Sequence, residues 1–209
     1  MALFQNYILR HDTLNRTMLR VLKQMKIQGI AFVGKMGSGK TTAASILCDE
    51  FKCTKLSFAT QLKNIASEFY GMHDKNRVLL QTLGTAMRSV DKNVFVNALK
   101  REMEEILQEA EKTFFVIDDV RYLNEFEFLR DCGFHMVYIY REALETDTSG
   151  TDTPETNHES ELLTSLPEQC SDVISNTESV RSLEIRVRDI YCQTVFYPRW
   201  NNGPLGQFS

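Results

Sequence analysis

The clearest chemical pattern in the chain is the stretch GKMGSGKT at residues 34–41. Its spacing, G-x-x-x-x-G-K followed by Ser or Thr, is typical of loops that hold the phosphates of a nucleotide. Glycines let successive backbone N–H groups point at phosphate oxygens, and a following helix adds the positive end of its dipole. The loop therefore predicts a donor phosphate site, but it does not distinguish phosphoryl transfer from hydrolysis or from a binding switch.

Each polar position in this loop has an expected role. Lys40 can reach the β- and γ-phosphates of ATP, and the Thr41 hydroxyl can ligate Mg²⁺. We expect Lys35 to be solvated, as lysines usually are. The predicted nucleotide-binding residues of this stretch are Gly34, Gly37, Ser38, Gly39, Lys40, Thr41 and Thr42.

Two further stretches place charge at the ends of expected strands. In FFVIDDVRY, Asp118 and Asp119 follow a buried strand, where ligands of open α/β sheets bind, and Arg121 lies just beyond. Either aspartate could hold the Mg²⁺ hydration shell, or it could cap the next helix. Arg141 ends the strand FHMVYIY, where it could clamp a transferring phosphate or form a surface ion pair.

The helical segment 59–95 contains cations suited to a second anion site. Lys63, Arg77 and Arg88 could bind an acceptor phosphate, while Phe58 and Phe95 could stack on or pack against a base. The alternative for each residue alone is ordinary: phenylalanines in the core and arginines on solvated helix faces. A second anion site facing the loop favours phosphoryl transfer over a switch or motor.

Strand and helix patterns alternate along the chain, which predicts an α/β fold with a parallel sheet covered on both faces. Apolar runs predict strands in IQGIAFVG, TKLSF, KTFFVIDDV, FHMVYIY and SDVISN. Helical spacing predicts helices in KTTAASILCDEF, in three pieces of 59–111 broken near Gly71 and Asp91, in LNEFEFLRDCG closed by Gly133, and in SVRSLEIRVRDIYCQ.

These elements imply a domain at 27–195 with flanking segments. Residues 1–26 show helical spacing and a basic face, residues 141–160 form a polar loop that could close as a lid, and 196–209 are an irregular tail. The basic extension is expected to pack on the flank of the domain, with contact to a partner as the alternative.

Composition excludes several classes of protein. The 209 residues carry a net charge of −4, which argues against direct nucleic-acid binding. The five scattered cysteines suggest neither a disulfide framework nor a zinc site. No apolar run could span a bilayer and the N-terminus makes a poor signal peptide, so we expect a cytoplasmic protein without membrane contact. A homodimer is plausible on general grounds.

The order of these motifs resembles the bacteriophage deoxynucleoside monophosphate kinases. The resemblance runs from about residue 28 to 192 and is carried by seven stretches. They are GKMGSGKTT, FATQLK, QTLGTAMRSVD, VIDDVRYLNEFEFLRDCG, VYIYR, HESE and SDVISN. The second half of this set is more specific than the glycine-rich loop, which unrelated enzymes share.

The resemblance implies a three-layer P-loop kinase fold and transfer of the γ-phosphoryl group of ATP, with Mg²⁺, to a deoxynucleoside monophosphate. It implies that Asp119 and Arg121 lie between donor and acceptor and that Arg141 is the lid-side arginine. Asn176 would contact adenine through its backbone, and His158 and Glu159 would mark the end of the lid. The acceptor site would contain Phe58, Ala59, Lys63, Gln81, Gly84, Thr85, Arg88 and Glu161.

Two features depart from that family. The extension before the first strand is long, and residues 142–157 contain no Lys or Arg, although a lid over phosphates normally contributes cations. A kinase for another small molecule, such as dephospho-coenzyme A, is one alternative function. A noncatalytic nucleotide-binding module that engages a partner is the other.

Overall fold

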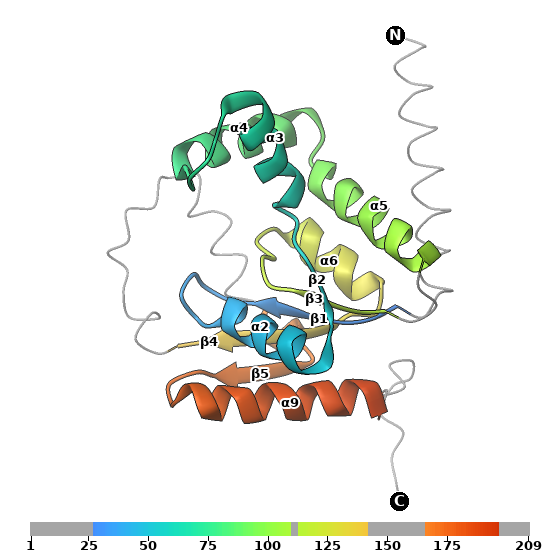
Figure 1. Cartoon of the computed structure of the whole chain (residues 1–209). Helices are drawn as coiled ribbons and strands as arrows, with labels where there is room; N and C mark the ends of the chain where they lie inside the picture. The colour runs from blue at the N-terminus through green and yellow to red at the C-terminus, as the bar shows by residue number, and fades with distance from the viewer. Residues whose placement is uncertain (1–26, 110–112, 142–165, 197–209) are drawn as a thin grey trace, which may run out of the picture.

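A computed structural model describes residues 27–109, 113–141 and 166–196 (Figure 1). The predicted N-terminal helix, most of the predicted lid and the C-terminal tail lie outside these ranges. Within the described residues, no helix is both long and apolar enough to cross a membrane.

The centre of the domain is a five-stranded sheet in which every strand pairing is parallel. The strands are β1 (Gln28–Val33), β2 (Thr54–Leu56), β3 (Phe114–Ile117), β4 (His135–Tyr140) and β5 (Asp172–Ser175). All five match stretches predicted from apolar runs. Their order is β2-β3-β1-β4-β5, so β1 lies at the centre between β3 and β4.

Helices cover both faces of the sheet, which confirms the predicted three-layer α/β fold (Figure 1). Alternate side chains of β1 face opposite ways, as the two-residue repeat of a strand requires. Ile30 and Phe32 pack with α2 (Lys40–Phe51) and α9 (Val180–Phe196). Ala31 and Val33 belong to the other cluster, which includes α5 (Val94–Glu109) and α6 (Leu123–Asp131).

Three helices occupy the segment predicted to be helical in three pieces. They are α3 (Thr60–Tyr70), α4 (Arg77–Val90) and α5, and the breaks fall at Gly71 and Asp91 as expected. Helices α3 and α4 pack against one another above the sheet (Figure 1). The short 3-10 helix η1 (Pro167–Gln169), before β5, was not predicted.

The strand order decides where a ligand can bind. Because β1 has β3 on one side and β4 on the other, the loops that follow these three strands leave the same edge of the sheet side by side. Ligands of open parallel sheets bind at this carboxyl edge. The glycine-rich loop, the aspartate pair and Arg141 all lie there.

Candidate active site

The glycine-rich loop turns sharply between β1 and α2, and two of its glycines cannot be replaced without conflict. Gly34 has φ 144°, and a Cβ there would lie 2.1 Å from the carbonyl oxygen of Ile139. Gly39 has φ 109°, and a Cβ there would lie 2.4 Å from Asn176 Nδ2. Both angles are ones that residues with a side chain rarely adopt. The loop is therefore held in one tight conformation by its neighbours.

The inside of this loop offers unused hydrogen-bond donors. The Ser38 hydroxyl is fully buried and has no hydrogen-bond partner among the described residues. Helix α2 begins at Lys40 and has no side-chain cap, so its first N–H groups are not satisfied by a capping side chain. A phosphate group would satisfy both sets of donors, and a helix N-terminus favours its charge. The loop fits the phosphates of a nucleotide.

Lys40 connects the loop electrostatically to the end of β3. Its Nζ donates hydrogen bonds to the carbonyl oxygens of Gly34 and Lys35, each at 2.6 Å. Burial and, less strongly, the charge of Arg121 lower the pKa of Lys40 to about 8, although the charge of Asp118 raises it. These three residues form the charged cluster of the site: Lys40, Asp118 and Arg121. The loop and the aspartate stretch thus face one another, as predicted.

Asp118 is the aspartate that faces the donor loop. Its side chain is 8% exposed, and its Oδ2 accepts a hydrogen bond from Lys55 Nζ on β2 at 2.8 Å. No pattern in the sequence pointed to Lys55. The described residues contain no cluster of three or more metal-binding side chains. Mg²⁺ usually takes only one or two protein ligands beside phosphates and water. Asp118 and the exposed Thr41 hydroxyl would supply that number of ligands.

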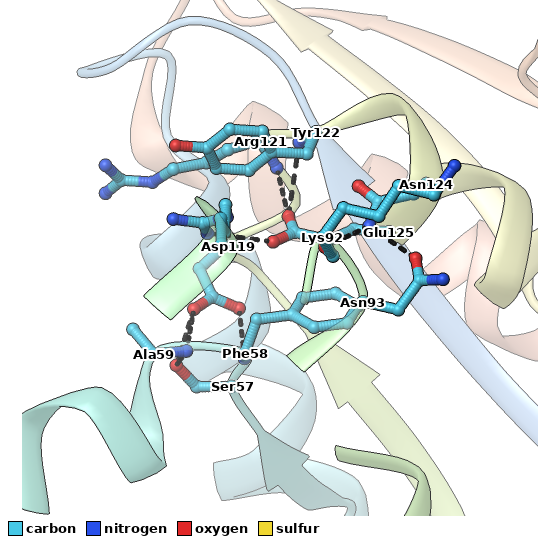
Figure 2. Close-up of polar contacts among 11 residues, drawn as sticks. Ser57, Phe58, Ala59, Lys92, Asn93, Asp119, Arg121, Tyr122, Asn124 and Glu125 are labelled. Carbon is cyan, nitrogen blue, oxygen red and sulfur yellow. Dashed lines mark hydrogen bonds and ion pairs between the residues drawn. The ribbon is translucent and has the colours of Figure 1, made fainter. Parts of the chain in front are cut away.

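Asp119 has a different task, because its carboxylate holds the turn between β2 and α3 (Figure 2). Its Oδ2 accepts hydrogen bonds from Ser57 Oγ at 2.6 Å and from Ala59 N at 3.0 Å. Its Oδ1 accepts one from Phe58 N at 3.1 Å. These bonds involve both carboxylate oxygens. Asp119 therefore ties the helical segment to the end of β3, next to the charged cluster.

The alternative that an aspartate caps the following helix is wrong. The backbone N–H groups before α6 are bonded instead by Glu125, whose Oε2 accepts from Arg121 N at 2.9 Å and Tyr122 N at 3.2 Å (Figure 2). Glu125 lies in the stretch VIDDVRYLNEFEFLRDCG, but no role was predicted for it. A glutamate three residues after the N-cap residue, here Tyr122, is a known capping signal, so the spacing could have identified it.

Stacking of Phe58 or Phe95 on a base, one reading of the sequence, is contradicted by their burial. Phe58 is 4% exposed and Phe95 2% exposed, and both belong to the core cluster beneath α5 and α6. Their rings fill the core, which is the alternative that the sequence left open. Phe58 contributes its backbone N–H to the Asp119 anchor.

The other predicted acceptor residues separate into two groups. Lys63, Gln81 and Thr85 are exposed on α3 and α4, where a ligand can reach them. Arg77 and Arg88 also have protein partners: Arg77 is exposed, and its Nη2 lies 3.3 Å from Met36 Sδ of the glycine-rich loop. Arg88 is paired with Glu125, and Gly84 lies buried beside it. Glu161, His158 and Glu159 lie outside the described residues.

Arg141 and Asn176 form a connection to the donor loop. Arg141 Nε donates to the Asn176 carbonyl at 3.2 Å, and Asn176 N donates to the Tyr140 carbonyl at 2.8 Å. The buried Asn176 amide donates through Nδ2 to the Ser38 carbonyl at 2.8 Å. Both backbone groups of Asn176 are thus bonded within the chain. The structure shows Asn176 supporting the loop, and the backbone contact to adenine that the resemblance implied stays a prediction.

We expect Asn176→Ala to raise the KM for ATP by about 10-fold, because the loop loses one buried hydrogen bond of about 1.5 kcal/mol. Steady-state kinetics with varied ATP measure this change. Asn97→Ala is the control, since Asn97 Nδ2 makes a comparable bond to Asp91 on the surface, away from the loop. An unchanged KM for ATP in Asn176→Ala would show that the loop keeps its shape without this side chain.

The fold and this site together define a P-loop kinase, an enzyme that transfers phosphoryl groups. The sequence profile described as Deoxynucleotide monophosphate kinase matches residues 75–187, more than half of the chain. The chain belongs to the deoxynucleotide monophosphate kinase family.

One relative agrees with this assignment. A protein of Acanthamoeba polyphaga mimivirus named "Putative deoxynucleotide monophosphate kinase" is 28% identical over 147 residues, which cover 56% of this chain and 76% of that protein. This similarity does not test the predicted bacteriophage origin of the chain.

Two solved structures share the fold. TT1252 from Thermus thermophilus matches with a TM-score of 0.53 and 17% sequence identity. Dephospho-CoA kinase from Campylobacter jejuni matches with a TM-score of 0.53 and 12% sequence identity. Each comparison covers 80% of this chain and 97% of the other.

Proposed function

We propose that the protein transfers the γ-phosphoryl group of ATP to a deoxynucleoside 5′-monophosphate and releases ADP and the deoxynucleoside diphosphate. The observation that carries this proposal is the pair of aspartates at the end of β3. Asp118 belongs to the charged cluster at the donor loop, while Asp119 anchors the turn that leads into α3. Donor and acceptor elements therefore converge on one strand end. Supply of deoxynucleotides for phage DNA replication is the role that the resemblance suggests.

The chemistry asks mainly for positioning and neutralisation of charge. An oxygen of the acceptor phosphate forms a bond to the γ-phosphorus as the bond to the β–γ bridging oxygen breaks. The acceptor is already anionic at neutral pH, so no general base is required. Lys40 and Arg121 would neutralise charge on the transferred group, and Arg141 would act from the end of β4.

A bound Mg²⁺ ion would neutralise phosphate charge. Thr41 and Asp118 would hold it. The acceptor would lie against the exposed side chains of α3 and α4, namely Lys63, Gln81 and Thr85, with the partly exposed Arg88 beside them.

The test is release of ADP from ATP and Mg²⁺ with each of the four common deoxynucleoside monophosphates. We expect ADP release that depends on at least one of them and exceeds that with the matching ribonucleotide. Dephospho-coenzyme A is included because a kinase for that acceptor has the same fold. Turnover with dephospho-coenzyme A alone would overturn the proposal. Tight ATP binding without acceptor-dependent ADP release would favour the noncatalytic binding module.

A further inference from the structure

The carboxylate of Glu125 is almost completely buried, yet it belongs to the polar edge of the active site. Glu125 is 2% exposed at the start of α6. Its two oxygens have different partners: Oε2 accepts from the backbone N–H groups of Arg121 and Tyr122, and Oε1 accepts from Arg88 Nη2 at 3.3 Å. One carboxylate therefore joins α4 to the turn that carries Arg121.

Arg88 is held between two aromatic rings and the Glu125 carboxylate, and its side chain stays 23% exposed. Its guanidinium carbon lies 3.7 Å from the centre of the Tyr122 ring and 4.4 Å from the centre of the Phe95 ring. A Cβ at Gly84 would lie 3.1 Å from Arg88 Nη1, so the glycine leaves room for the guanidinium. The aromatic rings fix its plane, and Glu125 supplies the charged partner.

A second contact ties the start of α6 to the same helices. Asn124 Nδ2 donates to the Lys92 carbonyl at 2.9 Å and lies 3.0 Å from Asn93 Oδ1, in the turn between α4 and α5 (Figure 2). The N-terminus of α6 is therefore joined to the predicted acceptor helices at two places. Unlike the Asn124 contact, the Glu125 contact places a carboxylate charge there.

Capping alone does not explain a buried charge at this position. Burial raises the pKa of Glu125 to about 7, although both backbone hydrogen bonds and the charge of Arg88 lower it. The charge of Asp119, on the same turn, contributes to this rise. A buried ion pair seldom adds net stability compared with apolar side chains. If Glu125 only had to start α6, its buried pairing with Arg88 would therefore bring little benefit.

We propose that Glu125 is a positioning residue that couples the two substrate sites: one oxygen orients Arg88 toward the acceptor, and the other fixes the turn from which Arg121 reaches the donor loop. This inference rests on the proposed function, because it takes Arg88 and Arg121 to face substrate. The ionised form of the Glu125 carboxylate is the form that links Arg88 to the turn carrying Arg121. Protonation removes the charge that holds Arg88 while leaving an oxygen for the backbone.

The substitution Glu125→Gln separates the two halves of this role. Glutamine keeps an oxygen for the N–H groups of Arg121 and Tyr122, but its amide nitrogen then meets Arg88 as donor against donor. We expect the KM for the deoxynucleoside monophosphate to rise about 10-fold, with the KM for ATP changed less than twofold. Glu127→Gln is the matched control, since it makes the same chemical change at an exposed position of the same helix.

The pH profile gives a second readout. Relative to Glu125→Gln, the wild type should bind the acceptor more tightly at pH 8 and lose that advantage as pH falls through about 7. The ratio of the two KM values cancels titration of the acceptor itself. The charged groups that act on Glu125 are Arg88 from α4 and Asp119 from its own turn, while α5 contributes the Phe95 ring. A ratio that does not change with pH would overturn the proposal.

Arg88→Ala and the double variant test whether Glu125 acts through Arg88. We expect the double variant to match Arg88→Ala within twofold in acceptor KM. If the two substitutions raised the acceptor KM independently, so that their effects multiplied in the double variant, the proposal would be overturned. It would also be overturned if Glu125→Gln had the same acceptor KM as Glu127→Gln. Neither result would contradict the kinase function. If Glu125→Gln does not fold, Arg88→Ala must by itself raise the acceptor KM and spare ATP, or the proposal fails.

A readout that needs no turnover separates this inference from the proposed function. The ¹⁵N resonance of Arg88 Nε should shift between pH 6 and 8 in the wild type, and it should not shift in Glu125→Gln. Failure of all four monophosphates as acceptors, with this shift present, would refute the kinase substrate but not the pairing. Activity without the shift would refute the role of Glu125.

Discussion

Replacing Lys40 by alanine should lower kcat by about 1,000-fold, the largest effect expected of any single side chain in this protein. The ammonium group of Lys40 is bonded to two loop carbonyls and is coupled electrostatically to Arg121 and Asp118. Its charge would stabilise the phosphoryl group as the bond to the leaving oxygen breaks, so the loss should fall on the transition state. Single-turnover ADP formation at saturating ATP measures this effect.

Lys52→Ala is the control for this substitution, because Lys52 lies at the opposite end of α2 and is exposed. It should change kcat by less than twofold. Lys40→Ala must also keep the melting temperature of the wild type within a few degrees, so that lost folding is not mistaken for lost catalysis. Turnover within about threefold of the wild type would show that the loop does not hold the transferred phosphate.

The fold was largely predictable because its signals are local. Strands that are buried on both faces read as short apolar runs, and helix α2 was predicted at the residues where it occurs. Gly71 and Asp91 marked the helix breaks because each ends a helix through its own backbone conformation. The order of the strands is different, since it depends on contacts between segments far apart in the sequence.

The site was predicted less completely for the same reason. The donor loop is a contiguous motif, so its residues were found directly. The partners of the aspartates are distant in sequence: Asp118 meets Lys55, and Asp119 meets the turn at Phe58, about 60 residues earlier in each case. Nor does the sequence around Asn176 indicate that its amide reaches Ser38. A residue type identifies possible chemistry, but its partner depends on the tertiary fold.

The two neighbouring aspartates should respond differently to the same substitution. Asp119→Asn should lower kcat/KM for the acceptor by about 10- to 100-fold without changing the Mg²⁺ requirement. An asparagine there keeps one oxygen, and its amide group faces an N–H donor of Phe58 or Ala59. An unsatisfied buried donor costs about 1–3 kcal/mol, and the turn into α3 would shift with it. Initial rates with varied acceptor measure the loss.

Asp118→Asn is the matched variant, one residue away with an identical chemical change. It should raise the Mg²⁺ concentration needed for half-maximal activity by about 10-fold or more, because Asp118 faces Lys40 and has the chemistry of a Mg²⁺ ligand. Titration of activity with Mg²⁺ at fixed ATP distinguishes the pair. If Asp119→Asn raised the Mg²⁺ requirement as much as Asp118→Asn, the three hydrogen bonds to the β2–α3 turn would not be the main task of Asp119. The division of one strand end into a donor side and an acceptor side would then be wrong.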